Sequence, residues 1–165
     1  MMISEKMAKA LNEHIQWELY ASYLYLGISA WFEEQDLPGC ARWMREQSKE
    51  EITHAMKFFD YINEVGGRVL LQAIEAPPMK WKDATDAFKA ALAHERKVTK
   101  RVNELVDMAA KEKDHATRIF LNWFVSEQVE EENQLRGILG MFRYTGPNMH
   151  GMLIIDKKLG KRDED

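Results

Sequence analysis

The sequence predicts an all-α fold, a four-helix bundle with one long crossover connection and a short fifth helix at the C-terminal end. Four long segments carry an apolar residue every three or four positions, which is the spacing of a buried helix face. Proline is scarce, with 4 residues in 165, and none lies in the interior of those segments, where it would break a helix. The length suits one domain, which we predict over residues 1–165, with the bundle at about 4–144.

The first two segments are expected to form a helical hairpin. The first helix should run over about 4–34, with the hydroxyl of Ser4 capping its first turn. The second should run over about 38–65, because Pro38 is tolerated in a first helical turn. Gly66 and Gly67 follow the last apolar position and are typical of a helix end.

The second half should form another hairpin, joined to the first by a long connection. Residues 68–82 include Pro77 and Pro78 and are expected to be extended. Helices should follow over about 83–111 and 114–143, each beginning at an aspartate cap, and a short helix over about 147–159. Short turns produce antiparallel neighbours, whereas the long connection can cross the length of the bundle.

Composition excludes several classes of function. The net charge of −4 favours neither nucleic acid nor an anionic membrane surface as a partner. Cys40 is the only cysteine, so a disulfide within the chain and a zinc site of paired cysteines are excluded. The first residues are charged and resemble no signal peptide, and no stretch of roughly 18 apolar residues exists. We therefore expect a cytoplasmic protein without a membrane partner.

The inward stripe of each helix is interrupted near its midpoint by a polar side chain. The interrupting residues are Glu18 in the first helix, Glu51 and His54 in the second, Glu95 in the third, and Gln128 and Glu131 in the fourth. Counted from the turns, their heights differ by about 6–8 Å, near one helical turn, so long side chains can meet at one level.

A bound cation explains this pattern. Carboxylates in an apolar core are prohibitive when uncompensated, and they raise one another's pKa. Glu51 and His54 are three residues apart, so they lie on one helix face and can approach the same ion. Mixed carboxylate and imidazole ligands suit iron, manganese or zinc, and the residues alone leave that choice open.

Several motifs together resemble the bacterial and archaeal non-haem ferritins, members of the ferritin-like di-iron family. They are QWELYASYLYL around Glu18, SKEEITHAMKFFDYINEVGGR around Glu51, Ala93-His94-Glu95, and EKDHATRIFLNWFVSEQVEEE around Gln128. The resemblance implies a first iron site at Glu18, Glu51 and His54, and a second that Glu51 bridges and Glu95 completes. It further implies an amide ligand, Gln128, and a tyrosine, Tyr25, both among the catalytic residues, with Trp123 nearby. It also implies an accessory third iron site at Glu50, Glu127, Glu130 and Glu131.

The same resemblance implies an activity and an assembly. The expected activity is a ferroxidase, which oxidises Fe²⁺ to Fe³⁺ with O₂ or H₂O₂ and deposits ferric mineral inside a homo-oligomeric cage of 24 subunits. Apolar outer positions at Leu19, Leu24 and Leu26 are consistent with subunit pairing. No haem is expected, because Ile52 follows the bridging glutamate where the haem-binding relatives carry methionine.

Two other functions remain open at this stage. One is a di-iron peroxidase or oxidase of the rubrerythrin type that stores nothing, although the second Glu-x-x-His pair and the four cysteines of that family are missing. The other is a structural or partner-binding bundle whose core acids bind no metal or bind zinc passively. Among the remaining histidines, we expect His14, His94 and His115 to face solvent.

Overall fold

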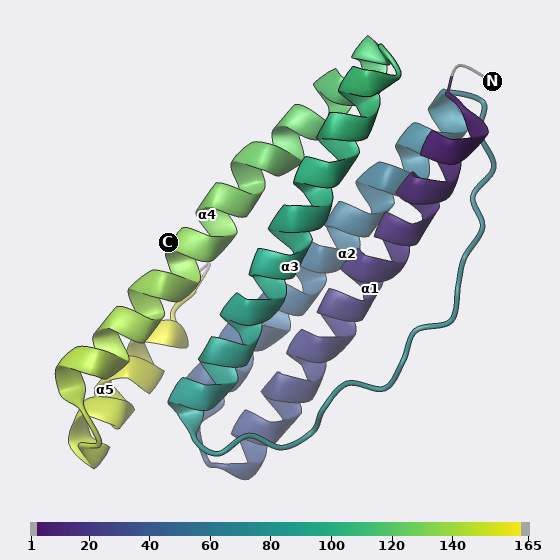
Figure 1. The fold of residues 1–165 in the computed structure, drawn as a ribbon. Helices are drawn as coiled ribbons and strands as arrows, with labels where there is room; N and C mark the ends of the chain where they lie inside the picture. Colours follow the sequence, from purple (N-terminus) through teal and green to yellow (C-terminus); the bar gives the residue numbers. More distant parts are fainter. Residues whose placement is uncertain (1–2, 163–165) are drawn as a thin grey trace.

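The structure, a computed structural model that describes residues 3–162, confirms the all-α fold (Figure 1). Its helices are α1 (Glu5–Glu34), α2 (Pro38–Glu64), α3 (Ala84–Lys111), α4 (His115–Thr145) and α5 (Met149–Leu159). The first four lie roughly side by side as two hairpins, α1 with α2 and α3 with α4, and α5 folds back against one end of the bundle. No helix in this part of the chain is long and apolar enough to cross a membrane.

The helix ends lie close to the predicted ones because the expected capping residues act there. Ser4 Oγ accepts a hydrogen bond from the Met7 amide at 3.0 Å and caps α1. Asp83 and Asp114 cap α3 and α4 in the same way. Helix α2 ends before Gly66, whose φ of 74° lies in the left-handed region that glycine adopts without strain.

The crossover connection between α2 and α3 has no helix or strand and runs along the outside of α1 (Figure 1). Side chains of α1 hold it in place. Asn12 donates to the Arg68 carbonyl at 3.0 Å and accepts from the Leu70 amide at 2.6 Å, and Gln16 donates to the Ala73 carbonyl at 2.6 Å. The connection is therefore a fixed strap that allows α2 and α3 to run parallel within the bundle.

The core is divided into two apolar clusters. Around one end of the bundle lie residues such as Phe32, Met44, Phe88 and Leu135, and around the other lie Leu11, Phe58, Val98 and Phe124. The polar residues that interrupt the four stripes lie between the two clusters in the sequence of every bundle helix. The fold thus sets a buried polar layer between two apolar cores.

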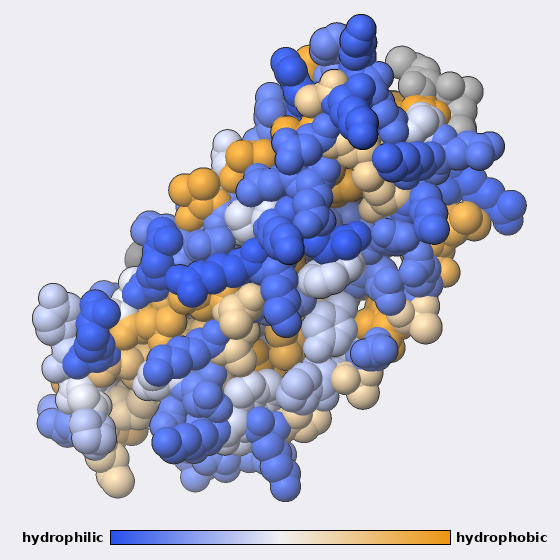
Figure 2. All heavy atoms as spheres, viewed as in Figure 1, coloured by the Kyte–Doolittle hydropathy of each residue, from blue (hydrophilic) through white to orange (hydrophobic). Residues whose placement is uncertain are grey.

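The outer apolar positions differ in part from the prediction. Leu26 is exposed, as expected, but Leu24 is buried in the core and Leu19 is half-buried. The reason is that α1 is covered on two sides, by α2 and by α3, so its buried arc is wide. On the face seen in Figure 2 most of the surface is hydrophilic, with apolar patches along α4 and in the groove between α3 and α4.

Candidate metal centre

The polar layer is built from side chains of all four bundle helices, and none of them is more than 3% exposed. They are Glu18 and Tyr25 from α1, Gln47, Glu51 and His54 from α2, Glu95 from α3, and Gln128 and Glu131 from α4. Each lies in phase with its apolar neighbours at helical spacing, so the same periodicity that builds the core directs these polar groups inward.

One group of metal-ligand atoms comes from Glu18, Glu51 and His54. One ligand atom of each lies within 4.8 Å of the other two, close enough to surround one ion. His54 Nδ1 lies 3.1 Å from Glu51 Oε2 and 3.9 Å from Glu18 Oε2. Glu18 Oε2 is buried without a hydrogen-bond partner among the described residues, which is costly unless a ligand meets it.

A second group comes from Glu51, Glu95 and Glu131, again with ligand atoms within 4.8 Å of one another. Gln47 Nε2 donates to Glu51 Oε1 at 3.0 Å and to Glu131 Oε2 at 2.6 Å, so this amide ties two of the three carboxylates together. Because Glu51 belongs to both groups, it can bridge two ions. Gln47 was absent from the predicted site, although it occupies the same stripe one turn before Glu51.

Glu95 is held by donors from two helices. The Tyr25 hydroxyl donates to Glu95 Oε1, and Gln128 Nε2 donates to Glu95 Oε2 at 3.0 Å. The same amide nitrogen contacts the Glu95 carbonyl and Thr99 Oγ1, both at 3.2 Å. Tyr25 and Gln128 therefore lie directly beside a candidate ligand, and both act on it as hydrogen-bond donors.

A third group lies toward the surface of α4 and comes from His54, Glu127 and Glu131. His54 Nε2 lies 3.7 Å from Glu127 Oε1, on the opposite side of the ring from the first group. The side chain of Glu127 is 23% exposed, whereas Glu131 is buried, so the three groups form a series from the core toward solvent.

Two predicted accessory residues are arranged differently. Glu50 Oε1 is 3.0 Å from Nη2 of Arg162, which follows the end of α5. Glu130 is exposed. Neither belongs to a ligand group among the described residues, so the geometry brings together Glu127 and Glu131 but leaves Glu50 and Glu130 at the periphery.

The carboxyl groups of the layer have strongly altered proton affinities. Burial, followed by repulsion from Glu95, raises the pKa of Glu51 well above its ordinary value and that of Glu131 to about 9. Burial also raises the pKa of Glu95 to about 7, against the opposing hydrogen bonds from Tyr25 and Gln128. Several carboxyls of the metal-free layer therefore hold protons near neutral pH, and a bound cation would displace them.

Glu18 differs from the other carboxyls. Burial raises its pKa, but the hydrogen bond from His14 and the attraction of the His14 and His54 rings outweigh burial, and the net pKa lies below its ordinary value. Glu18 is thus an ionised carboxylate even without a metal ion. This carboxylate is ready to accept a cation without first losing a proton.

Two of the histidines predicted to face solvent are buried instead. His14 is fully buried, and its Nε2 lies 2.8 Å from Glu18 Oε1. His94 is 7% exposed and stacks on Trp17, with ring centroids 6.0 Å apart. Both predictions were wrong because neighbouring helices cover positions beside the main stripes: His14 packs against Phe58 of α2, and His94 packs against α1. His115 is exposed, as expected.

Trp123 lies on the outer side of the third group. Its ring meets His54 edge-on, with centroids 5.4 Å apart, while Lys57 Nζ lies 4.2 Å from the ring centroid. Because Trp123 remains 40% exposed, it lies at the surface and not in the core. Its ring covers part of the His54 imidazole from the solvent side.

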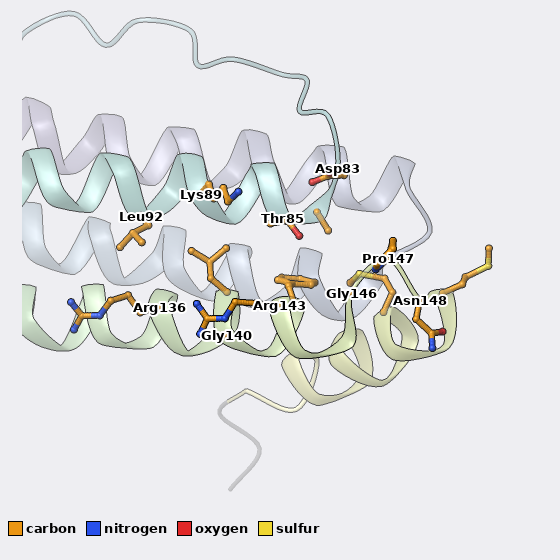
Figure 3. A pocket seen from close by; sticks show the side chains of 15 residues that line it. Asp83, Thr85, Lys89, Leu92, Arg136, Gly140, Arg143, Gly146, Pro147 and Asn148 are labelled. Atoms are coloured by element: carbon orange, nitrogen blue, oxygen red, sulfur yellow. The ribbon is translucent and has the colours of Figure 1, made fainter.

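The polar layer is separate from a large open hollow of about 1010 Å³ at the end of the bundle where α3 begins and α4 ends (Figure 3). Leu92 of α3 and Arg136, Gly140 and Arg143 of α4 line it, and the turn from Gly146 to Asn148 lies at its end. None of the candidate metal ligands lines this hollow. The candidate site is instead an interior layer filled by its own side chains.

Comparisons with known proteins agree with this geometry. The family described as "Ferritin-like domain" matches residues 8–144. A bacterial non-heme ferritin of Bacteroides fragilis is 44% identical over 161 residues, which are 98% of this chain and 100% of that protein. A probable bacterial non-heme ferritin-like protein of Haemophilus influenzae is 38% identical over 96% of both. Among solved structures, an open pore ferritin of the hyperthermophilic archaeon Archaeoglobus fulgidus matches with a TM-score of 0.97 and 48% identity, over 98% of this chain and 99% of that chain.

Proposed function

The chain belongs to the ferritin-like family, and from that premise we propose that it is an iron-storage ferritin subunit with ferroxidase activity. Residues 1–165 form a single domain in this proposal. The observation that supports this proposal best is that the three ligand groups share residues. Glu51 belongs to the first and second groups, Glu131 belongs to the second and third, and His54 belongs to the first and third. A purely structural bundle gains nothing from such a chain of buried acids.

The substrate Fe²⁺ would occupy the first two groups as a pair. Glu18 and His54 serve the first ion, Glu95 the second, and Glu51 bridges them. Each Fe²⁺ gives up one electron, and the two electrons with two protons reduce either O₂ to H₂O₂ or H₂O₂ to two waters. The carboxyls with raised pKa lose their protons as the cations bind, so charge is balanced within the layer.

The protein's own donors would set the geometry of this reaction. Tyr25 and Gln128 hold Glu95, and Gln47 holds Glu51 and Glu131, so the carboxylates cannot swing freely between ions. Ferric product is a hard ion that prefers oxygen ligands. Glu131 and Glu127 offer such ligands at the solvent side of the layer, with Glu50 and Glu130 beyond them, and this accessory iron site would relay Fe³⁺ from the bundle core to the mineral inside the cage.

The product would be stored in a homo-oligomeric cage of 24 subunits in the cytoplasm. The similarity to ferritin structures over nearly the whole chain supports a cage. Iron is the only metal that the proposal requires, and no haem takes part, since Ile52 offers no axial ligand.

An anaerobic Fe²⁺ titration followed by exposure to air tests the proposal. Absorbance reports ferric product, and light scattering reports particle mass. Rapid oxidation of about two ions per subunit, then continued uptake into a particle near 24 subunits, is the expected result. Turnover without accumulation would instead identify a di-iron oxidase, and the absence of iron binding would leave a structural bundle.

A further inference from the structure

His14 is a buried imidazole that the proposed iron chemistry has not yet used. It lies on α1 one turn before Glu18, is fully buried, and packs against Phe58 with ring centroids 4.5 Å apart. Its Nε2 lies 2.8 Å from Glu18 Oε1, while its Nδ1 has no hydrogen-bond partner among the described residues. The ring therefore has one polar contact in this part of the chain, and that contact is a candidate iron ligand.

The direction of this hydrogen bond follows from the charge of Glu18. A carboxylate that binds a cation has lost its proton and can only accept, so His14 Nε2 carries the hydrogen and donates it to Glu18 Oε1. Because Nε2 is directed at Oε1, it is not free to bind a metal ion itself. His14 is accordingly absent from every group of ligand atoms that can close on one ion.

The bond leaves the two oxygens of Glu18 in different roles. Oε1 accepts the hydrogen bond from His14, whereas Oε2 has no hydrogen-bond partner among the described residues and lies 3.9 Å from His54 Nδ1. Without the imidazole, rotation about the last side-chain bond would let either oxygen, or both, meet an ion. The donor thus selects the oxygen that faces Glu51 and His54.

We propose that His14 is a positioning residue that fixes Glu18 as a one-oxygen ligand of the first iron, and so makes that site tighter than the second. This inference rests on the proposed function. His14 acts on the first site alone, because its hydrogen bond is to Glu18, whereas Tyr25, Gln128 and Gln47 act on Glu95, Glu51 and Glu131 and not on Glu18. Removal of a hydrogen bond to a metal ligand weakens metal binding by about 10- to 100-fold.

The test uses Co²⁺, a divalent ion that accepts the same nitrogen and oxygen ligands, titrated into the assembled protein and followed by visible absorption and calorimetry. The wild-type protein should bind two ions per subunit with separate affinities. In His14→Leu, which keeps an apolar contact with Phe58 but has no donor, the tighter affinity should fall by about 10- to 100-fold and the weaker one should not move. In His14→Gln, whose amide nitrogen can replace Nε2, the tighter affinity should return to within about 3-fold of wild type.

A second readout reports the geometry rather than the affinity. Infrared difference spectra on binding Co²⁺ distinguish a carboxylate that uses one oxygen from one that uses two, by the splitting of its stretching bands. His14→Leu should lose a one-oxygen signal that wild type and His14→Gln retain. His94→Leu is the matched control, because His94 is also a buried imidazole but no candidate ligand is hydrogen-bonded to it; it should bind both ions as wild type does.

The possible results separate the two proposals. Unchanged affinities in His14→Leu, or equal losses in His14→Leu and His14→Gln, would overturn the positioning role, since the second result makes the imidazole itself the ligand. If His14→Leu does not fold, His14→Met removes the donor in its place and the same comparison decides. Failure of the wild-type protein to bind a pair of ions would instead overturn the proposed function, whatever the His14 variants do.

Discussion

At the scale of single residues, Glu51 is the ligand that the two proposed iron ions share, because it belongs to both the first and the second ligand group. We expect Glu51→Gln to lower the initial rate of Fe²⁺ oxidation by more than about 100-fold, since both ions lose their common ligand. The metal-free variant should melt at the same or a higher temperature than wild type, because the neutral amide needs no proton on folding, whereas the raised pKa of Glu51 requires proton uptake.

The measurement is stopped-flow absorbance of the ferric product, with thermal melting of the metal-free protein. Glu64→Gln makes the same chemical change at an exposed position of the same helix and should oxidise Fe²⁺ at the wild-type rate. A Glu51→Gln protein that oxidises iron within about 2-fold of wild type would remove Glu51 from the site.

The raised pKa values of the layer predict how stability depends on pH. Glu95 has a pKa of about 7 and Glu131 of about 9, both above the ordinary value of 4.5, so the folded metal-free protein binds more protons than the unfolded chain. The stabilisation that these bound protons give to the folded protein is complete below the ordinary pKa of 4.5, and it is lost as pH rises through the folded-state pKa values. The melting temperature of metal-free protein should therefore fall between about pH 5 and 9.

One variant and one added ligand sharpen this pH test. Glu131→Gln should flatten the fall above pH 7, because the group that titrates highest is gone. Bound divalent cation should flatten it as well, since the ion replaces the protons. A melting temperature of the metal-free wild type that rises steadily from pH 5 to 9 would contradict the assignment of protonated carboxyls to the layer.

At the scale of helices, one buried aspartate of α5 links that helix to the start of α2. Helix α2 begins without a capping side chain of its own, and Asp156 of α5 supplies the acceptor. Its carboxylate accepts from the Cys40 amide at 2.8 Å and from the Gly39 amide at 3.2 Å. A carboxylate at a helix N-terminus is further stabilised by the helix dipole. One side chain therefore caps α2 and docks α5.

We expect Asp156→Ala to lower the free energy of unfolding by about 1–2 kcal/mol, the cost of a lost cap. Urea unfolding followed by circular dichroism measures it. Asp156→Asn, which retains one acceptor oxygen, should lose less, and the exposed Lys157→Ala on the same helix should be close to neutral. If Asp156→Ala unfolds at the wild-type urea concentration, the docking contact contributes nothing to stability.

The main elements and most of the site were predictable from sequence because they depend on local periodicity. The stripes, the caps at Ser4, Asp83 and Asp114, and the Glu51–His54 pair all follow from helical spacing within one segment. The burial of His14 and His94 depends on which helices α1 and α3 meet across the bundle, and a single segment does not encode that. The same holds for Gln47, whose role appears only when Glu131 of α4 lies opposite it.

At the scale of the whole molecule, the apolar surface that remains exposed in one subunit suggests how subunits meet. Tyr23 and Leu26 are three residues apart on one face of α1 and are 48% and 45% exposed. The crossover connection beside α1 adds the exposed side chains of Leu71, Ile74 and Met79. Exposed apolar residues that gather on one side of a subunit are typical of protein–protein contacts, so we expect this face to be buried when the cage assembles.

A charge placed in that face should therefore prevent assembly while leaving the subunit folded. In Leu26→Glu an unpaired carboxylate would be buried in every copy of the contact, at a cost of several kcal/mol each. Sedimentation velocity should show small species in place of the full particle, with unchanged helix content by circular dichroism. Asn103→Glu adds the same charge at an exposed position on α3 and should assemble normally. If Leu26→Glu still forms a full-sized particle, the contact between subunits must lie on another face. Mineral storage requires an enclosed cavity. A folded but unassembled Leu26→Glu protein should therefore oxidise Fe²⁺ and then precipitate the ferric product instead of retaining it.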